Sequence, residues 1–335
     1  MAVTIKDVAL RANVSITTVS HVLNKTRFVA ATTQQSVIAA VEELNYLPNT
    51  VAQSLKGKHT KSIGMLVTTT LNPFYAEVVK AVEKYCYLEG YNLVLCNTDG
   101  DFKKTDSYLK MLAQKRIDGV IIMCTEYDGD SFTTISSQSA LPMVVMDWGP
   151  IDPHLDRIQD NSFQGGYMAT QYLLENNHTS IGYIGGPLDK LPALNRYSGF
   201  SKAMADAQLN INPEWVIESD FQSEGGKTAM AKILALDELP TAIFVANDMM
   251  ALGAMCLAQQ SGLKIPDQLS IIGYDNISFS AYFSPPLTTI NQPKNRLARI
   301  AVNTLIERLR EDRPLGRTHL IEPDLVVRDS VAKLR

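Results

Sequence analysis

From Ser62 onward, short apolar runs alternate with amphipathic helical stretches, and this alternation is the strongest constraint on the fold. Strands that alternate with helices form parallel sheets covered on both faces. Buried strands are predicted at 63–67, 93–95, 120–122, 143–146, 181–184, 242–245 and 270–273, and helices at 74–88, 107–114, 167–174, 193–207, 229–236 and 251–260. Because the alternation restarts after Asp160, the sequence predicts an α/β body of two doubly wound lobes, with a ligand cleft at the carboxyl ends of the strands.

Composition and length indicate a cytoplasmic protein of about two domains. The chain has 335 residues, of which 45% are hydrophobic and 20% charged, enough for a sizeable core. No apolar run reaches the roughly 18 residues of a membrane span, and Lys6, Asp7 and Arg11 interrupt any N-terminal signal sequence. The four cysteines form no CxxC pair, as in a reduced cytosolic protein. We therefore expect no membrane partner.

The net charge of −4 is unevenly distributed along the chain. Residues 1–61 have a net charge of +4, from seven Lys and Arg against three Asp and Glu. The remaining residues have a net charge of −8, from 24 against 32. A basic segment before an acidic body is typical of a small nucleic-acid-binding module attached to a larger soluble domain, although the charge alone is a weak indication.

The N-terminal segment contains three short helical patterns. Thr4 can cap a first helix with Asp7 as its capping-box partner, and Asn13 tolerates the left-handed conformation of a tight turn. Ser15 can cap a second helix, and a third helix is predicted at 32–45. Two helices joined by a short turn form the helix-turn-helix arrangement, whose second helix enters the major groove of DNA.

Four motifs of this segment resemble the DNA-binding headpiece of the lactose-repressor family. They are Thr4-Ile5-Lys6-Asp7-Val8-Ala9, Ala12-Asn13-Val14-Ser15, Thr18-Val19-Ser20-His21-Val22-Leu23-Asn24 and Leu44-Asn45-Tyr46-Leu47-Pro48-Asn49. The resemblance implies a headpiece over residues 1–46, a hinge helix over 47–60, and DNA contacts at Ile16, Thr17, His21, Arg27, Leu55 and Lys56. Thr17 and His21 can bond base edges, and Leu55 would wedge into the minor groove.

Polar and aromatic side chains gather where the predicted strands of the body end. These candidate ligand-binding residues are Asn72, Phe74, Tyr75, Asp147, Trp148, Arg196, Phe221, Asn247, Asp275 and Gln292. Flat rings can cover the C–H faces of a sugar, while Asp, Asn, Gln and Arg bond its hydroxyl groups. Each residue taken singly is more often a core or loop-capping residue, so the group as a whole indicates a binding cleft.

The body resembles the effector domain of the same family and, more distantly, periplasmic ribose-binding proteins. This resemblance implies two discontinuous lobes: an N-lobe of about 61–160 plus 292–322 and a C-lobe of about 161–291 plus 323–335. Within the family, residues 72–101 and 187–190 are most similar to the regulators of ribose operons. Lys190 and Pro192 stand where the purine regulators of the family have Arg and Thr, which disfavours a purine ligand.

The sequence therefore predicts a homodimeric repressor that binds a palindromic double-stranded DNA operator and is released by D-ribose. We expect no enzyme activity, cofactor, metal or catalytic residue, because GxGxxG, HExxH and GxSxG motifs are absent. Gly226-Lys227-Thr228 resembles the end of a phosphate loop, but Phe221 replaces its first glycine. Three alternatives stay open: a family member with a purine or another sugar as corepressor, a sugar-transport receptor, and a sugar-modifying enzyme.

Overall fold

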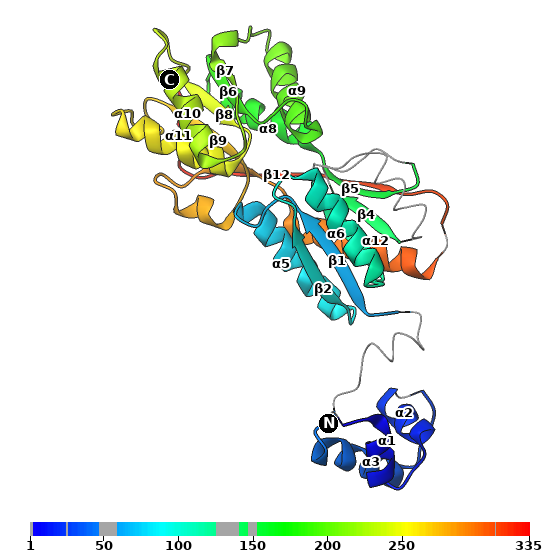
Figure 1. Ribbon diagram of the computed structural model, residues 1–335. Helices are drawn as coiled ribbons and strands as arrows, with labels where there is room; N and C mark the ends of the chain where they lie inside the picture. Colours follow the sequence, from blue (N-terminus) through cyan, green and yellow to red (C-terminus); the bar gives the residue numbers. More distant parts are fainter. Residues whose placement is uncertain (1–2, 25, 47–58, 125–140, 147–152, 312) are drawn as a thin grey trace. The chain divides into compact units, whose positions relative to one another are not determined.

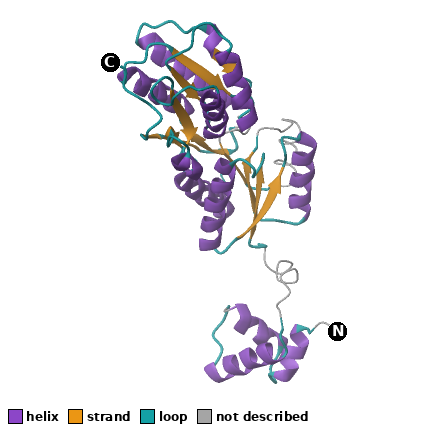
Figure 2. Ribbon diagram, turned by 90° about the vertical axis from the view of Figure 1, so that its left-hand side faces the viewer, coloured by secondary structure: helices purple, strands orange, loops and turns teal. Residues whose placement is uncertain are grey.

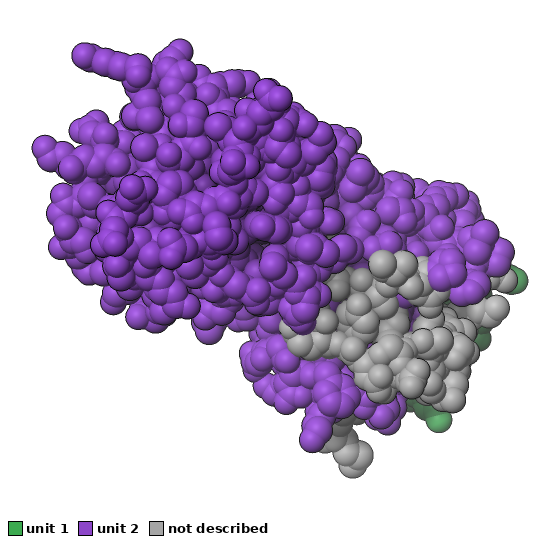
Figure 3. All heavy atoms as spheres, turned by 90° about the horizontal axis from the view of Figure 1, so that it is seen from above, with its two compact units in different colours: residues 1–60 green, residues 61–335 purple. Residues whose placement is uncertain are grey.

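The computed structural model describes residues 3–24, 26–46, 59–124, 141–146, 153–311 and 313–335. The chain divides into two compact units, residues 1–60 and residues 61–335, which Figure 3 draws in two colours. Within the ranges described, no helix is both long and apolar enough to cross a membrane.

The described part of the first unit is a bundle of three helices: α1 (Ile5–Arg11), α2 (Ile16–Asn24) and α3 (Ala31–Glu43). α1 begins at the predicted capping box of Thr4 and Asp7, and Asn13 has a φ of 50° in the turn that follows. α2 begins after Ser15, whose hydroxyl oxygen accepts the N–H of Thr18 at 3.0 Å. The helices enclose a small core of Val8, Ala9, Val19, Val37, Ala40 and Tyr46.

The first sheet of the larger unit has six parallel strands. In spatial order they are β11 (Thr318–Ile321), β5 (Asp156–Asp160), β4 (Met143–Met146), β3 (Gly119–Met123), β1 (Ser62–Val67) and β2 (Asn92–Asn97). Side chains of a strand alternate between the two faces, so Met65 packs on α5 (Pro73–Leu88) and α12 (Lys294–Arg310), while Leu66 packs on α6 (Phe102–Gln114). Both faces are thereby covered (Figure 1).

The second sheet also has six strands, of which β12 alone among those described runs antiparallel to its neighbour. Their order is β12 (Asp324–Val326), β10 (Thr288–Asn291), β9 (Ser270–Asp275), β8 (Ala242–Val245), β6 (Ile181–Gly185) and β7 (Val216–Glu218). Its helices pack in two pairs, α8 (Ser162–Glu175) with α9 (Leu191–Asp206) and α10 (Ser223–Leu234) with α11 (Asp248–Gln260). Two short 3-10 helices, Pro213–Trp215 and Ser278–Tyr282, complete the lobe.

Along the described strands, the chain passes between the two sheets three times. It leaves the first sheet after β5, returns from β10 to α12, and leaves again between β11 and β12. The two lobes joined by these crossings are visible in Figure 2. The architecture confirms the predicted fold, a helix-turn-helix headpiece with a two-lobed α/β body of parallel sheets. β5, β7, β10, β11 and α12 were not predicted from the sequence.

Candidate DNA-reading helix and effector cleft

The predicted base-reading residues lie on the outer side of α2. Ile16 is 42% exposed and Thr17 is exposed, whereas Val19 on the opposite side of the helix is fully buried. His21 is partly exposed, and Arg27 is exposed in the loop that follows α2. Exposed side chains along the second helix can reach base edges in the major groove. Leu55 and Lys56, the predicted hinge contacts, lie outside the described residues.

The His21 ring is held by a residue that the sequence reasoning missed. Nδ1 of His21 shares a 2.7 Å hydrogen bond with Oγ1 of Thr26, and the Thr26 N–H donates to the His21 carbonyl oxygen at 3.3 Å. The side-chain bond restricts the rotation of the imidazole and occupies its Nδ1 atom, and the backbone bond holds Thr26 next to His21. Nε2 is therefore the ring nitrogen of His21 that can form a hydrogen bond to a DNA base.

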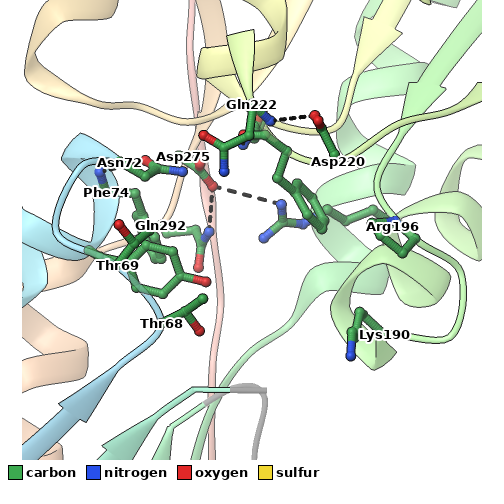
Figure 4. Close-up of a pocket in the computed structure, with 14 residues that line it drawn as sticks. Thr68, Thr69, Asn72, Phe74, Lys190, Arg196, Asp220, Gln222, Asp275 and Gln292 are labelled. Atoms are coloured by element: carbon green, nitrogen blue, oxygen red, sulfur yellow. Dashed lines mark hydrogen bonds and ion pairs between the residues drawn. The ribbon is translucent and has the colours of Figure 1, made fainter. Parts of the chain in front are cut away.

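The larger unit has a cavity of about 160 Å³, lined by residues of both lobes (Figure 4). Eight predicted ligand residues line it: Asn72, Phe74, Tyr75, Arg196, Phe221, Asn247, Asp275 and Gln292. Asp147 and Trp148, the other two, lie outside the described residues. The cavity is thus where the sequence placed it, at the carboxyl ends of the strands.

Six further residues line the cavity: Thr68, Thr69, Pro187, Lys190, Asp220 and Gln222. Thr68, Thr69, Asp220 and Gln222 were not predicted. Thr68 and Thr69 directly follow β1, and Asp220 and Gln222 flank Phe221, so their positions at strand ends were the available signal. Pro192 is not among the lining residues.

Two charged residues and one amide form the polar floor of the cavity. Arg196 and Asp275 are each 3% exposed, and Gln292 is 1% exposed. Nε2 of Gln292 donates to Oδ1 of Asp275 at 2.6 Å, and Nη1 of Arg196 lies 3.8 Å from the same oxygen. Burial raises the pKa of Asp275 to about 6, although Arg196 and Gln292 act in the opposite direction. The Gln292 amide and the Arg196 guanidinium hold the Asp275 carboxyl group in place as a hydrogen-bond acceptor.

Three buried polar atoms around the cavity make no hydrogen bond to any described residue. They are Nε of Arg196, Oε1 of Gln292 and Oγ1 of Thr68. A buried polar group without a partner costs about 1–3 kcal/mol. A ligand that supplies the missing partners recovers this cost, which favours a ligand with donors and acceptors on its edges.

Aromatic rings from both lobes flank the polar floor. Phe74 and Tyr75 come from the first lobe, with ring centroids 5.7 Å apart. Phe221 comes from the second lobe and has a φ of 65°, a left-handed conformation that is rare for a bulky residue. A Cβ at Gly186 would lie 2.0 Å from the Phe221 ring, so this glycine makes room for it. Asn247 fixes the same loop by donating from Nδ2 to the Phe221 carbonyl at 3.0 Å.

A second buried carboxyl group lies behind the floor. Asp248 is fully buried at the start of α11, and it accepts hydrogen bonds from the Ile277 N–H at 2.9 Å and the Thr289 hydroxyl at 2.6 Å. Burial, with the nearby Asp275 as a further cause, raises the pKa of Asp248 to about 8. In the part of the chain that the structure describes, no group of three or more His, Cys, Asp or Glu residues could hold a metal ion.

Comparisons with known proteins identify both parts of the chain. Residues 4–49 match bacterial regulatory proteins of the lacI family, and residues 170–331 match a periplasmic binding protein-like domain. The HTH-type transcriptional repressor PurR of Aliivibrio salmonicida is 52% identical over 331 residues, 99% of each chain. The lac repressor dimer bound to operator and the anti-inducer ONPF superposes with a TM-score of 0.90 and 30% identity, over 99% of this chain and 100% of that chain.

A solved lacI-family regulator from Enterococcus faecium with bound ribose is also similar. Its TM-score is 0.74 at 29% identity, over 82% of this chain and 100% of that chain. The prediction of a ribose operon repressor released by D-ribose is nevertheless wrong, because the far more similar full-length relative is a PurR repressor. The error has a physical cause: Asp, Asn, Gln and Arg side chains bond sugar hydroxyls and the edges of a purine equally well.

The headpiece, the two-lobed body and the full-length similarity agree with one another. They make this protein a DNA-binding transcriptional regulator and not an enzyme, as predicted. The chain belongs to the lacI family of bacterial regulatory proteins.

Proposed function

We propose that this protein is a homodimeric, cytoplasmic transcriptional repressor with a purine base as its corepressor. The observation that carries the proposal is the cleft, where aromatic rings flank a buried floor of one carboxylate, one guanidinium and one amide. Such a site suits a flat ring with donors and acceptors on its edges. The PurR relative, which is 52% identical over almost the whole chain, supports a purine as that ring.

The polar atoms of the floor match the edges of an oxopurine such as hypoxanthine or guanine. The Asp275 carboxylate accepts a ring N–H, and the guanidinium of Arg196 donates to a ring nitrogen or carbonyl oxygen. Oε1 of Gln292 and Oγ1 of Thr68 supply further bonds. Lys190 lines the same cavity and provides a cationic donor, while Pro192 does not line it and so does not oppose a purine.

On the DNA side, each subunit supplies one reading helix. The lac repressor to which this chain is similar was solved as a dimer on its operator. We expect two headpieces related by a twofold axis to read two half-sites of a palindromic operator through Ile16, Thr17, His21 and Arg27. A base that contacts both lobes favours one arrangement of the lobes over the other. The change in operator affinity cannot exceed the difference between the affinities of the base for these two arrangements.

The experiment has two stages. The full-length protein first selects its operator from a random double-stranded DNA library, and fluorescence anisotropy then gives operator affinity with hypoxanthine, guanine, adenine or D-ribose. We expect an oxopurine to tighten operator binding by roughly 5- to 150-fold, the usual range of allosteric coupling. A response to D-ribose alone, or weaker operator binding with the bases, would overturn the proposal.

A further inference from the structure

A buried tyrosine beneath the cleft contacts both a ligand-binding residue and the first crossing between the lobes. Tyr274 belongs to β9 and is fully buried. Its ring centroid lies 3.8 Å from Cζ of Arg196, and its hydroxyl donates to Oδ2 of Asp160 at 2.5 Å. Asp160 is the last residue of β5, where the chain leaves the first sheet. One side chain therefore connects the floor of the cleft to the strand that joins the lobes.

Arg196 is held by polar contacts and by the Tyr274 ring, over whose face it lies. Nη1 of Arg196 donates to the Ala246 carbonyl at 2.6 Å and lies 3.8 Å from Asp275, while Nε has no partner among the described residues. A planar guanidinium that lies over the face of an aromatic ring is restricted in its movement by that ring. Tyr274 thus sets the direction in which Arg196 presents its free donor to a ligand.

The other end of Tyr274 is equally constrained. The hydroxyl of Ser162 also donates to Oδ2 of Asp160, at 3.1 Å. Burial and the adjacent Asp160 hold the pKa of Tyr274 well above its ordinary value, so its hydroxyl remains a donor. A Cβ at Gly165 in α8 would lie 2.3 Å from the Tyr274 hydroxyl oxygen, so glycine at this position leaves the space that the bond requires.

A second tyrosine of the same lobe lacks such a bond. Tyr183 in β6 is 1% exposed and packs against Phe200 and Phe244, with ring centroids 5.1 and 5.3 Å away. Its hydroxyl has no hydrogen-bond partner within the described ranges. The core of this lobe therefore tolerates a buried tyrosine as an apolar ring, and the link to Asp160 distinguishes Tyr274 from it.

We propose that Tyr274 is a positioning residue that transmits effector binding at Arg196 to the first crossing between the lobes, through its bond to Asp160. The inference rests on the effector cleft proposed above. A ligand that bonds Arg196 displaces the guanidinium or fixes its position. Because the Tyr274 ring is packed closely against the guanidinium, the position of the ring changes with it. The hydroxyl carries that change to the end of β5, whose position depends on how the two lobes are arranged.

The test compares two tyrosines in the full-length protein. Tyr274→Phe removes the hydroxyl but keeps the ring beneath Arg196, and Tyr183→Phe removes a hydroxyl that has no partner. Calorimetry gives the affinity for guanine and hypoxanthine, and anisotropy gives operator affinity with and without saturating base. For Tyr274→Phe we expect the affinity for the base to stay within about threefold of wild type. The ratio of operator affinities with and without the base should be roughly fivefold to tenfold smaller, because one hydrogen bond is lost. Tyr183→Phe should match wild type in both.

A purely structural role for Tyr274 would lower the melting temperature and leave the effect of the base unchanged. Equal effects of the base in the two variants would therefore overturn this inference while leaving the proposed function intact. Failure of the wild-type protein to bind any purine base would overturn both. A reduced effect in Tyr274→Phe alone, with base affinity retained, is the result that supports the transmission role.

Discussion

The reading helix and the effector cleft hold their functional side chains in opposite ways. On α2, Ile16 is 42% exposed, and the backbone of this one helix positions most of the predicted base-reading residues. In the cleft, Arg196 and Asp275 are 3% exposed, and contacts from several elements position each of them. The difference implies that substitutions on α2 change DNA binding with little effect on stability, whereas substitutions in the cleft change ligand binding and stability together.

The largest effect is expected from the carboxyl group behind the cleft floor. Burial, together with Asp275, raises the pKa of Asp248 to about 8, against an ordinary value of 3.8. Between these pH values the folded protein binds the additional proton, so the free energy of unfolding falls as pH rises, by at most about 1.4 kcal/mol per pH unit. Asp248→Asn, which has the shape of the protonated group, should remove this slope from thermal unfolding between pH 7 and pH 8, above the pKa of about 6 that burial gives Asp275.

The headpiece has no buried carboxyl group among its described residues, because Asp7, Glu42 and Glu43 are all exposed. The pH dependence should therefore originate in the larger unit. A slope in Asp248→Asn that equals the wild-type slope would show that this carboxyl group does not cause it.

The next effect concerns ligand binding. Asp275→Asn removes the charge that we propose accepts a ligand N–H. Hydrogen bonds to charged groups contribute about 1.5–3 kcal/mol, so we expect roughly 10- to 150-fold weaker purine binding in calorimetry. Operator binding without effector should stay at the wild-type level. Asp220→Asn is the matched control, since Asp220 lines the same cavity but is exposed, and it should cost less than about threefold. Unaltered purine affinity in Asp275→Asn would remove this residue from the site.

A smaller and more localised effect is expected on α2. Thr17→Ala and His21→Ala should relax base discrimination at single operator positions by about 1–3 kcal/mol, with an unchanged melting temperature. Thr26→Val removes the hydroxyl that bonds His21 and should reproduce part of the His21→Ala effect, whereas Thr26→Ser keeps the hydroxyl and should not. Affinities across a library of operator variants provide the measurement, and wild-type discrimination in a variant excludes that residue from base reading.

The smallest effect is expected from an ion pair on the headpiece surface. Arg11 and Glu43 approach to 2.6 Å, but their side chains are 55% and 53% exposed. Exposed pairs of this kind contribute less than about 1 kcal/mol and are screened by salt. Arg11→Ala should therefore shift the melting temperature slightly at low salt and not at high salt. A large shift of the melting temperature that persists at high salt would contradict the expectation that exposed side chains of the headpiece contribute little to stability.

Local patterns in the sequence predicted the elements whose causes are local. The capping box at Thr4 and the left-handed turn at Asn13 were predicted because neighbouring residues alone produce them. Helix α6 begins at Phe102 and not at the predicted residue 107, because Asp101 caps it by accepting the Lys103 N–H at 2.7 Å. α12 was missed, since its apolar residues pack on a lobe built mainly from residues far earlier in the chain.

The cleft was predicted in place but not in chemistry. The carboxyl ends of parallel strands lie at one edge of a sheet, so the strand pattern placed Asn72 at such an edge of the first sheet and Asp275 at that of the second. Arg196 lies within α9, and the resemblance to ribose-binding proteins is what indicated it. The bond between Asp160 and Tyr274 joins residues 114 positions apart on different lobes, and no periodicity encodes such a pair. The ligand could not be read from residue types either, because carboxylate, amide and guanidinium groups serve many polar ligands.

The three crossings between the described strands of the two sheets also affect the order in which parts of the chain can fold during synthesis. β11 and β12, which complete the two sheets, follow one another between residues 318 and 326, whereas the headpiece core ends at Tyr46. During translation, domains fold from the N-terminus onward as they emerge from the ribosome. The nascent chain can therefore complete its DNA-reading helices early, but neither lobe has its full sheet until the final segment emerges. The headpiece can therefore fold before the larger unit has all the strands of its two sheets.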